Sequence, residues 1–444
     1  MEGVANSVED KLIDALSFKL KPGASYVQER KSVTFHPAGS NSYSSTSGVK
    51  LIKILLTGDG YLDPSTFRVM FDLVNMEPSA GGGTEKELRP LGGPWTFFRR
   101  MRVLCANQVV EDIDSYNRCH ELFSVLTASD SRVNVEAEGF GLDWDIRKHA
   151  TAPYTAAEFK GIIGGQSQTV LFKPLSGILN QSKFIPLRYA PITIELELVQ
   201  DSTEPILSTL ADGSEFTTAN TSLLWQIQNP QVKCDICTLD NQLDDNYTQH
   251  LLSGKSLPIN YNTYVSQIQT VSSQKVLLNI TRSLSRLKSV FVTLDKTIND
   301  IARKRWNTFY SPMRFANASA HTIYHQSGEF ETQLQIGSKL FPEYPIRSHA
   351  EAYYQLRKTL GHASSSLHNF DVSAHEYRDN KMIMAIDCER VLEAGFTGLN
   401  TRAGDILNVK FNHNSADHLA DQMHIVLHSD CIMEIRDSGI QVFD

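Results

Sequence analysis

The segment Ile192–Leu198 constrains the fold more strongly than any other stretch of this sequence. Isoleucine and leucine alternate there with threonine and glutamate, so apolar side chains recur at every second position. A period of two places alternate side chains on opposite faces of a β-strand, whereas an amphipathic helix has a period near 3.6. We therefore expect a strand with one buried face and one solvated face that carries Thr193, Glu195 and Glu197.

Apolar runs bounded by turn residues recur along the whole chain and predict an all-β fold. In the first half the predicted strands are Val49–Thr57, Phe67–Asn75, Met101–Val110, Thr169–Phe172 and Leu224–Thr238. In the second half they are Tyr264–Val271, Val276–Ile280, Ser289–Leu294, Phe330–Ile336, Lys381–Ile386, Ile406–Phe411, His424–Leu427 and Ile432–Ile435.

Few helices are predicted, and their ends carry recognisable signals. One helix begins at Asp114, an N-cap type of residue. Another begins with a capping box formed by Ser348 and Glu351 and is expected to end at Gly361. A shorter helix is predicted over Lys296–Arg305.

The chain divides into two halves of similar design, each with strands, one helix in a long polar excursion, and more strands. All-β domains run to about 200–250 residues, so 444 residues accommodate two β-sandwiches. We expect an amphipathic arm over residues 1–25, a first sandwich over 26–245 and a second over 246–444. A polar stretch, Gln242–Leu257, marks the junction.

Composition limits the functional classes. The net charge of −8 argues against a protein whose main role is to coat nucleic acid. Six scattered cysteines fit reduced thiols in a cell better than a disulfide framework. The first residues lack a secretory signal pattern, and no stretch approaches the roughly 20 apolar residues of a membrane span, so we expect the chain to be made inside a cell.

No catalytic, cofactor-binding or metal-ligating residue is predicted. Gly81–Lys86 and Gly161–Gln166 are glycine-rich but lack the spacing and context of a phosphate-binding loop, so both are expected to be plain loops. Cys234 and Cys237 lie three residues apart in a predicted strand, where they would point to opposite faces and could not share a metal ion.

Two kinds of polar cluster have structural interpretations. The histidines near the C-terminus are expected to be surface or loop residues; they are His413, His418, His424 and His428. The basic runs Arg99–Arg102 and Arg303–Trp306 could contact nucleic acid or an acidic partner, but in an acidic chain we expect solvated faces or salt bridges between subunits.

Three segments resemble the double jelly-roll major capsid proteins, and the last of them resembles the second jelly roll in polinton-like viruses and virophages. None contains a catalytic signature. The segments are Gly92–Val103 with Glu111–Asn117, Pro174–Leu179 with Phe184–Pro191, and Leu334–Pro342 with Pro345–Arg347 and Ala350–Gly361.

The resemblance implies two eight-stranded jelly rolls side by side in each chain, and no enzyme activity. Three chains would form a pseudo-hexagonal capsomer, and capsomers, with penton and minor capsid proteins, would tile the icosahedral shell of a double-stranded DNA virus. The arm over residues 1–25 would lie inside the shell, against neighbours, a minor protein or an internal membrane. The long loops Glu77–Pro94, Asp201–Thr221 and His362–Asp379 would form outer towers. No cofactor and no specific nucleic-acid binding are expected.

Two other classes stay open from the residues alone. A carbohydrate-active β-sandwich enzyme would need a cleft with convergent carboxylates and stacking aromatic rings, but Trp95, Trp225 and Trp306 are dispersed in the sequence. A glycan-binding or receptor-binding attachment protein would bind glycans without forming a tiled shell.

Overall fold

The computed structural model describes residues 27–444 with internal gaps. The gaps are residues 82, 84, 128–130, 132–134, 136, 141–160, 208–220, 296–308, 310, 312–329, 362–371, 373–376, 379–380, 392–395, 403–405 and 415–418. The predicted arm, the predicted helix over Lys296–Arg305, the basic run Arg303–Trp306 and most of the loop His362–Asp379 therefore lie outside the described residues.

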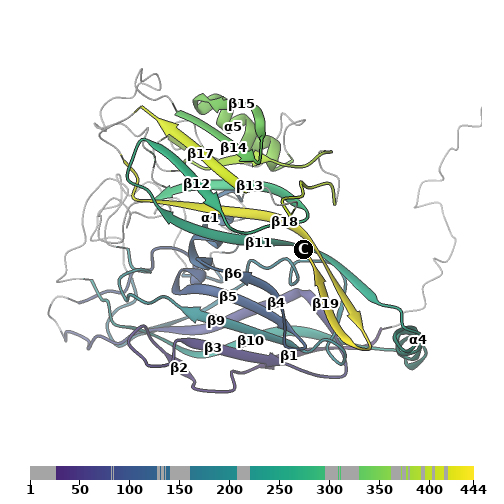
Figure 1. Cartoon of the computed structure of the whole chain (residues 1–444). Helices are drawn as coiled ribbons and strands as arrows, with labels where there is room; N and C mark the ends of the chain where they lie inside the picture. The colour runs from purple at the N-terminus through teal and green to yellow at the C-terminus, as the bar shows by residue number, and fades with distance from the viewer. Residues whose placement is uncertain are drawn as a thin grey trace, which may run out of the picture.

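The first half of the chain forms two antiparallel sheets, which are drawn in the lower part of Figure 1. One sheet has the order β1-β10-β4-β7, with the short strands β2 and β8 at its margins, and the other has the order β3-β9-β5-β6. The strands are β1 (Val27–Phe35), β2 (Ser42–Tyr43), β3 (Leu51–Leu56), β4 (Tyr61–Asn75), β5 (Phe98–Cys105), β6 (Gln108–Ile113), β7 (Ser167–Phe172), β8 (Ile185–Pro186), β9 (Ile192–Leu198) and β10 (Trp225–Leu239).

The second half forms two further antiparallel sheets above the first pair. Their orders are β11-β18-β13-β16, with β19 beside β18, and β12-β17-β14-β15. The strands are β11 (Leu257–Thr270), β12 (Lys275–Ile280), β13 (Leu287–Asp295), β14 (Phe330–Ile336), β15 (Lys339–Arg347), β16 (Met384–Asp387), β17 (Leu407–His413), β18 (Gln422–Arg436) and β19 (Gly439–Phe443).

Both halves have the same topology. When β2, β8 and β19, which lie off the main path of their sheets, are set aside and the remaining eight strands of each half are numbered along the chain, both halves read 1-8-3-6 in one sheet and 2-7-4-5 in the other. This is the order of a jelly roll, an eight-stranded sandwich of two Greek keys. The all-β class and the double jelly roll expected from the sequence are therefore confirmed.

The helices occupy equivalent places in the two rolls. α1 (Tyr116–Val125) and α5 (Ser348–Thr359) both lie between the fifth and sixth strands of their roll, as the echo in the sequence predicts. α5 begins where predicted, but its N-cap is Arg347 and not Ser348, so the predicted capping box forms only in a shifted version. The Arg347 N–H donates to Glu351, and the Glu351 N–H donates to the Ser348 hydroxyl at 3.5 Å. α1 differs from its prediction, because its N-cap is Ser115 in a left-handed conformation and makes no side-chain cap.

Three strand predictions divide the chain wrongly, and β4 and β11 begin six and seven residues earlier than predicted. The predicted strand Met101–Val110 is the hairpin β5–β6, whose turn at Ala106 and Asn107 has φ values of 46° and 66°. Positive φ at both central residues matches the twist of adjacent strands, so this pair closes a tight hairpin. The strands predicted at His424–Leu427 and Ile432–Ile435 are parts of one strand, β18.

Besides the short strands β2 and β8 and the 3₁₀ helix η2 (Pro94–Phe97), four elements were not predicted, and each lacks the pattern used to find the others. β1 is exposed along most of its length and pairs with one neighbour, β10, while β19 is short. β15 contains Pro342 and Pro345, which are tolerated because it is an edge strand. α4 (Asn241–Leu252), in the polar junction, buries one residue, Leu251, and so has no apolar stripe.

Candidate functional site

The two rolls pack directly against each other along a contact that we call the seam. On the first roll the seam comprises β6, α1 and the loop Ser176–Ile178; on the second it comprises β11, β13 and β18 (Figure 1). The hydroxyl of Tyr261 on β11 donates to the carbonyl of Val110 on β6 at 2.9 Å. The seam is a candidate functional element because it fixes how the two rolls lie relative to each other.

A buried carboxylate organises the first-roll side of the seam. Glu111 accepts hydrogen bonds from the Ser176 hydroxyl and from the backbone N–H groups of Gly177, at 2.8 Å, and Ile178, at 3.4 Å. Burial raises the pKa of Glu111, and these hydrogen bonds oppose the rise. The loop is thereby held against the second roll: a Cβ added at Gly177 would lie 1.4 Å from the carbonyl oxygen of Asn262. The seam therefore has no room for a side chain at this position.

A buried ion pair joins α1 to β13 across the seam. The Arg118 guanidinium donates to both carboxylate oxygens of Asp295, at 2.6 and 2.9 Å, and lies 4.8 Å from the centre of the Phe309 ring. Arg118 is 8% exposed and Asp295 is 3% exposed. A bidentate pair in this setting fixes direction as well as distance.

Aromatic rings fill the seam beside this pair. The Phe123 ring lies 4.6 Å from that of Tyr264 and 5.3 Å from that of Phe291. Tyr264 in turn stacks on His428 at 5.1 Å. The prediction of surface or loop histidines is thus wrong for β18: His424 is 1% exposed, His428 lies beneath Tyr264, and burial lowers the pKa of both to about 3. The reason is that β18 is central in its sheet.

Two other predicted histidines have different outcomes. His413, at the end of β17, is buried, so the surface prediction is wrong there too. His418 lies outside the described residues.

The predicted wet face of β9 is covered except at Glu197, whose side chain is 31% exposed. Glu195 is 7% exposed because Arg102 of β5, at 2.7 Å, and Lys53 of β3, at 3.4 Å, cover its carboxylate. Thr193 is also buried. The flanking strands carry long basic side chains whose aliphatic parts exclude water from a polar row.

The basic run Arg99–Arg102 belongs to this same charged row. Arg100 forms a bidentate pair with Asp112 at 2.6 and 2.7 Å, and Arg99 lies 3.9 Å from Glu197. The run is thus neutralised within the chain, which leaves little positive charge for nucleic acid.

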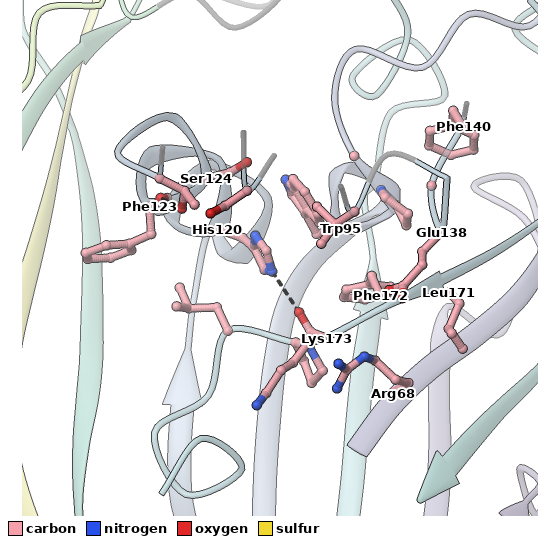
Figure 2. Close-up of a pocket in the computed structure, with 18 of the residues that line it drawn as sticks. Arg68, Trp95, His120, Phe123, Ser124, Glu138, Phe140, Leu171, Phe172 and Lys173 are labelled. Carbon is pink, nitrogen blue, oxygen red and sulfur yellow. Dashed lines mark hydrogen bonds between the residues drawn. The ribbon is translucent and has the colours of Figure 1, made fainter. Parts of the chain in front are cut away.

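A cavity of about 460 Å³ opens beside α1, between that helix, the 3₁₀ helix η2 (Pro94–Phe97) and the end of β7 (Figure 2). Four aromatic side chains line it: Trp95, Phe123, Phe140 and Phe172. The Trp95 ring stacks on His120 at 4.0 Å, and its indole N–H donates to Glu121 at 2.8 Å. The wall is therefore held in place by hydrogen bonds and stacking.

Polar groups surround the aromatic wall. Burial lowers the pKa of His120 to about 4, so the ring is neutral near pH 7, and its Nε2 lies 3.3 Å from the carbonyl oxygen of Lys173. Lys173 and Arg68 place two cationic side chains at this cavity, and Glu138 is the one carboxylate that lines it among the described residues.

Sequence reasoning missed this cavity because its walls come from distant segments. Trp95 and Trp225 are far apart in sequence, but Trp225 contacts Phe97 at 4.9 Å, two residues from Trp95. The aromatic run Trp95–Phe98 was the available signal. The glycine-rich segment Gly161–Gln166 is a loop, as expected.

Within the described ranges, no group of three or more histidine, cysteine, aspartate or glutamate side chains is arranged to hold a metal ion. No helix in this part of the chain is both long and apolar enough to cross a membrane. All six cysteines are free and buried.

The sequence matches no protein-family model and no curated protein. The fold, however, matches solved viral structures at low identity. PBCV-1 VP54, fitted into a reconstruction of the virophage Sputnik, aligns over 96% of this chain and 99% of its own, with a TM-score of 0.59 and 11% identity. The Sputnik virophage structure aligns over 98% of this chain and 92% of its own, with a TM-score of 0.59 and 9% identity.

The Faustovirus major capsid protein aligns over 96% of this chain and 93% of its own, with a TM-score of 0.55 and 9% identity. These alignments span both rolls and the seam between them. The chain therefore has the double jelly-roll fold found in the major capsid proteins of double-stranded DNA viruses and virophages.

Proposed function

We propose that this protein is the major capsid protein of a double-stranded DNA virus and acts by self-assembly in the virion shell. One observation carries the proposal: a single chain holds two jelly rolls of identical strand order, locked together across a buried seam. Two equivalent blocks in fixed orientation let three chains present six similar blocks around a threefold axis. The structural likeness over at least 96% of the chain supports this proposal.

We further propose that the chain forms a homotrimer that contacts neighbouring capsomers, penton proteins and minor capsid proteins. The domain limits expected from the sequence remain part of this proposal, with residues 26–245 and 246–444 as the two rolls. Their boundary lies within α4, which connects β10 to β11. The arm over residues 1–25 would contact neighbours on the inner side of the shell.

The alternative of a carbohydrate-active enzyme finds less support. A glycosidase uses a pair of carboxylates at the scissile bond, and the aromatic cavity has one lining carboxylate, Glu138, among the described residues.

The proposal is tested by the solution mass and shape of the purified chain. Light scattering is expected to give about 149 kDa, three times the 49.7 kDa of one chain, and negative-stain images should show hexagonal outlines. A stable monomer that stays monomeric under all assembly conditions and hydrolyses polysaccharides would contradict it.

The arm is tested separately by deleting residues 2–25. The shortened chain is expected to form the same trimer but to close shells poorly. Normal particles from the shortened chain would refute the role of the arm and leave the trimer proposal intact.

A further inference from the structure

The cavity beside α1 has the dimensions and walls of a small-molecule site. Its volume of about 460 Å³ lies within the usual 300–1,000 Å³ of ligand pockets, which are lined by aromatic and apolar side chains with a few placed polar groups. Trp95 and Phe172 form much of the wall, with ring centres 6.2 Å apart. All the described residues that line the site lie in the first roll, and one of them, Phe123, also contacts the second roll in the seam.

The wall is formed before any ligand arrives. Trp95 is fixed on one side by stacking on His120 and at its N–H by Glu121. Phe172 ends β7, whose hydrogen bonds to β4 hold its backbone. A preformed apolar cavity favours ligands with an apolar body, because little conformational entropy is lost on binding.

Two cations at the cavity give its charge preference. Arg68 donates to the backbone carbonyls of Ser65, at 3.1 Å, and Phe67, at 2.9 Å. Neither Arg68 nor Lys173 forms a salt bridge with a carboxylate in the described ranges of the chain. Figure 2 shows both side chains at the same end of the cavity.

The two cations repel each other. Burial lowers the pKa of Lys173, and the positive charge of Arg68 lowers it further, while Asp63 opposes the change. Asp63 is itself paired with Arg30 at 2.9 Å. A chain of net charge −8 thus keeps, next to an aromatic wall, two cations that form no salt bridge among the described residues. An anionic group bound between them would relieve the repulsion and form charge-assisted hydrogen bonds.

We propose that this cavity binds a single-chain anionic amphiphile, namely a long-chain carboxylate, with its apolar body against Trp95 and Phe172 and its carboxylate between Arg68 and Lys173. Glu138 is exposed, so water screens its charge and weakens its repulsion of a bound carboxylate.

The test uses the purified full-length chain and sodium laurate below its micelle concentration. Isothermal titration and native mass spectrometry are expected to show one laurate per chain, with Trp95 fluorescence changing on binding. Methyl laurate and dodecyltrimethylammonium are expected to bind at least about tenfold more weakly, because they lack the anionic head. The double variant Arg68→Ala/Lys173→Ala should weaken laurate binding by about tenfold or more.

Matched controls separate charge from stability. Lys31→Ala/Lys255→Ala removes two exposed cations on β1 and after α4 and should bind laurate as the wild type does. Ser124→Trp, which fills the cavity from α1, should abolish binding while the melting temperature shows that the chain is folded. Trp95→Phe should remove the fluorescence signal but keep binding.

Three results would overturn the inference. They are equal binding of laurate and dodecyltrimethylammonium, unchanged laurate binding in the Arg68→Ala/Lys173→Ala variant, and saturable binding of a neutral oligosaccharide without laurate binding. The last result would assign the cavity to glycans.

Discussion

The buried pair of Arg118 and Asp295 allows a quantitative test of the seam. Arg118→Met keeps the aliphatic stem of the side chain but removes both hydrogen bonds to Asp295, which is 3% exposed in the wild-type chain. Breaking a buried ion pair leaves an uncompensated charge and costs about 3–5 kcal/mol of unfolding free energy. We therefore expect Arg118→Met to lose an amount in this range.

The double variant Arg118→Met/Asp295→Leu separates the pair from its surroundings. Replacing both partners by apolar side chains of similar volume is often neutral or stabilising, so the double variant should recover most of the loss. The coupling energy from this double-mutant cycle should then be about 3 kcal/mol or more.

Urea unfolding followed by circular dichroism and tryptophan fluorescence measures these values. Arg99→Met is the matched control, because the Arg99 side chain is 44% exposed and lies 3.9 Å from Glu197, a pair worth at most about 1 kcal/mol. A loss for Arg118→Met no larger than that of Arg99→Met would refute the reasoning, since Asp295 would then be hydrated and the seam would be looser than described.

Three further predictions concern the seam, its histidines and a helix end. Gly177→Ala should destabilise the fold by at least about 1–3 kcal/mol in urea, whereas Gly48→Ala, where a Cβ meets nothing within 4 Å, should change it little; equal effects would contradict the close approach. Burial lowers the pKa of His424 to about 3, so below pH 6.5 the unfolded chain binds more protons than the folded chain. The free energy of unfolding should therefore fall as the pH falls towards 3, by up to about 1.4 kcal/mol per pH unit. His424→Gln should flatten the plot of unfolding free energy against pH between pH 6.5 and 4.5, and an unchanged slope would refute this assignment. Glu351→Ala, which removes the acceptor at the start of α5, should cost about 1 kcal/mol in urea unfolding, and a loss below about 0.3 kcal/mol would show that water replaces the cap.

Local pattern predicted most strands because their apolar residues recur with the period of the sheet. Ile192–Leu198 is β9 with the predicted limits, and Phe330–Ile336 is β14. β1 and α4 were missed because both bury few side chains, so neither has a regular pattern of apolar residues. Pattern alone also could not show that the polar side of β9 is covered, since Lys53 and Arg102 reach it from other strands.

The seam and the cavity depend on contacts that no local pattern encodes. Arg118 and Asp295 are separated by most of one roll in the sequence, and their pairing follows from how the two rolls pack. The cavity likewise joins η2, α1 and the end of β7. The sequence predicted some of the elements that carry these side chains. Which side chains come into contact, however, is decided only when the elements of the two rolls pack together.

Because all six cysteines are buried, the rate at which their thiols are alkylated measures how often the fold opens. Burial raises the pKa of Cys105, Cys234 and Cys431 to about 12, and a thiol reacts as its thiolate. An alkylating reagent can therefore reach them only when the sandwiches open, so its rate reports the frequency of opening. Since the first two lie in the first roll and Cys431 lies in the second, mapping the modified peptides over time would reveal which roll opens first.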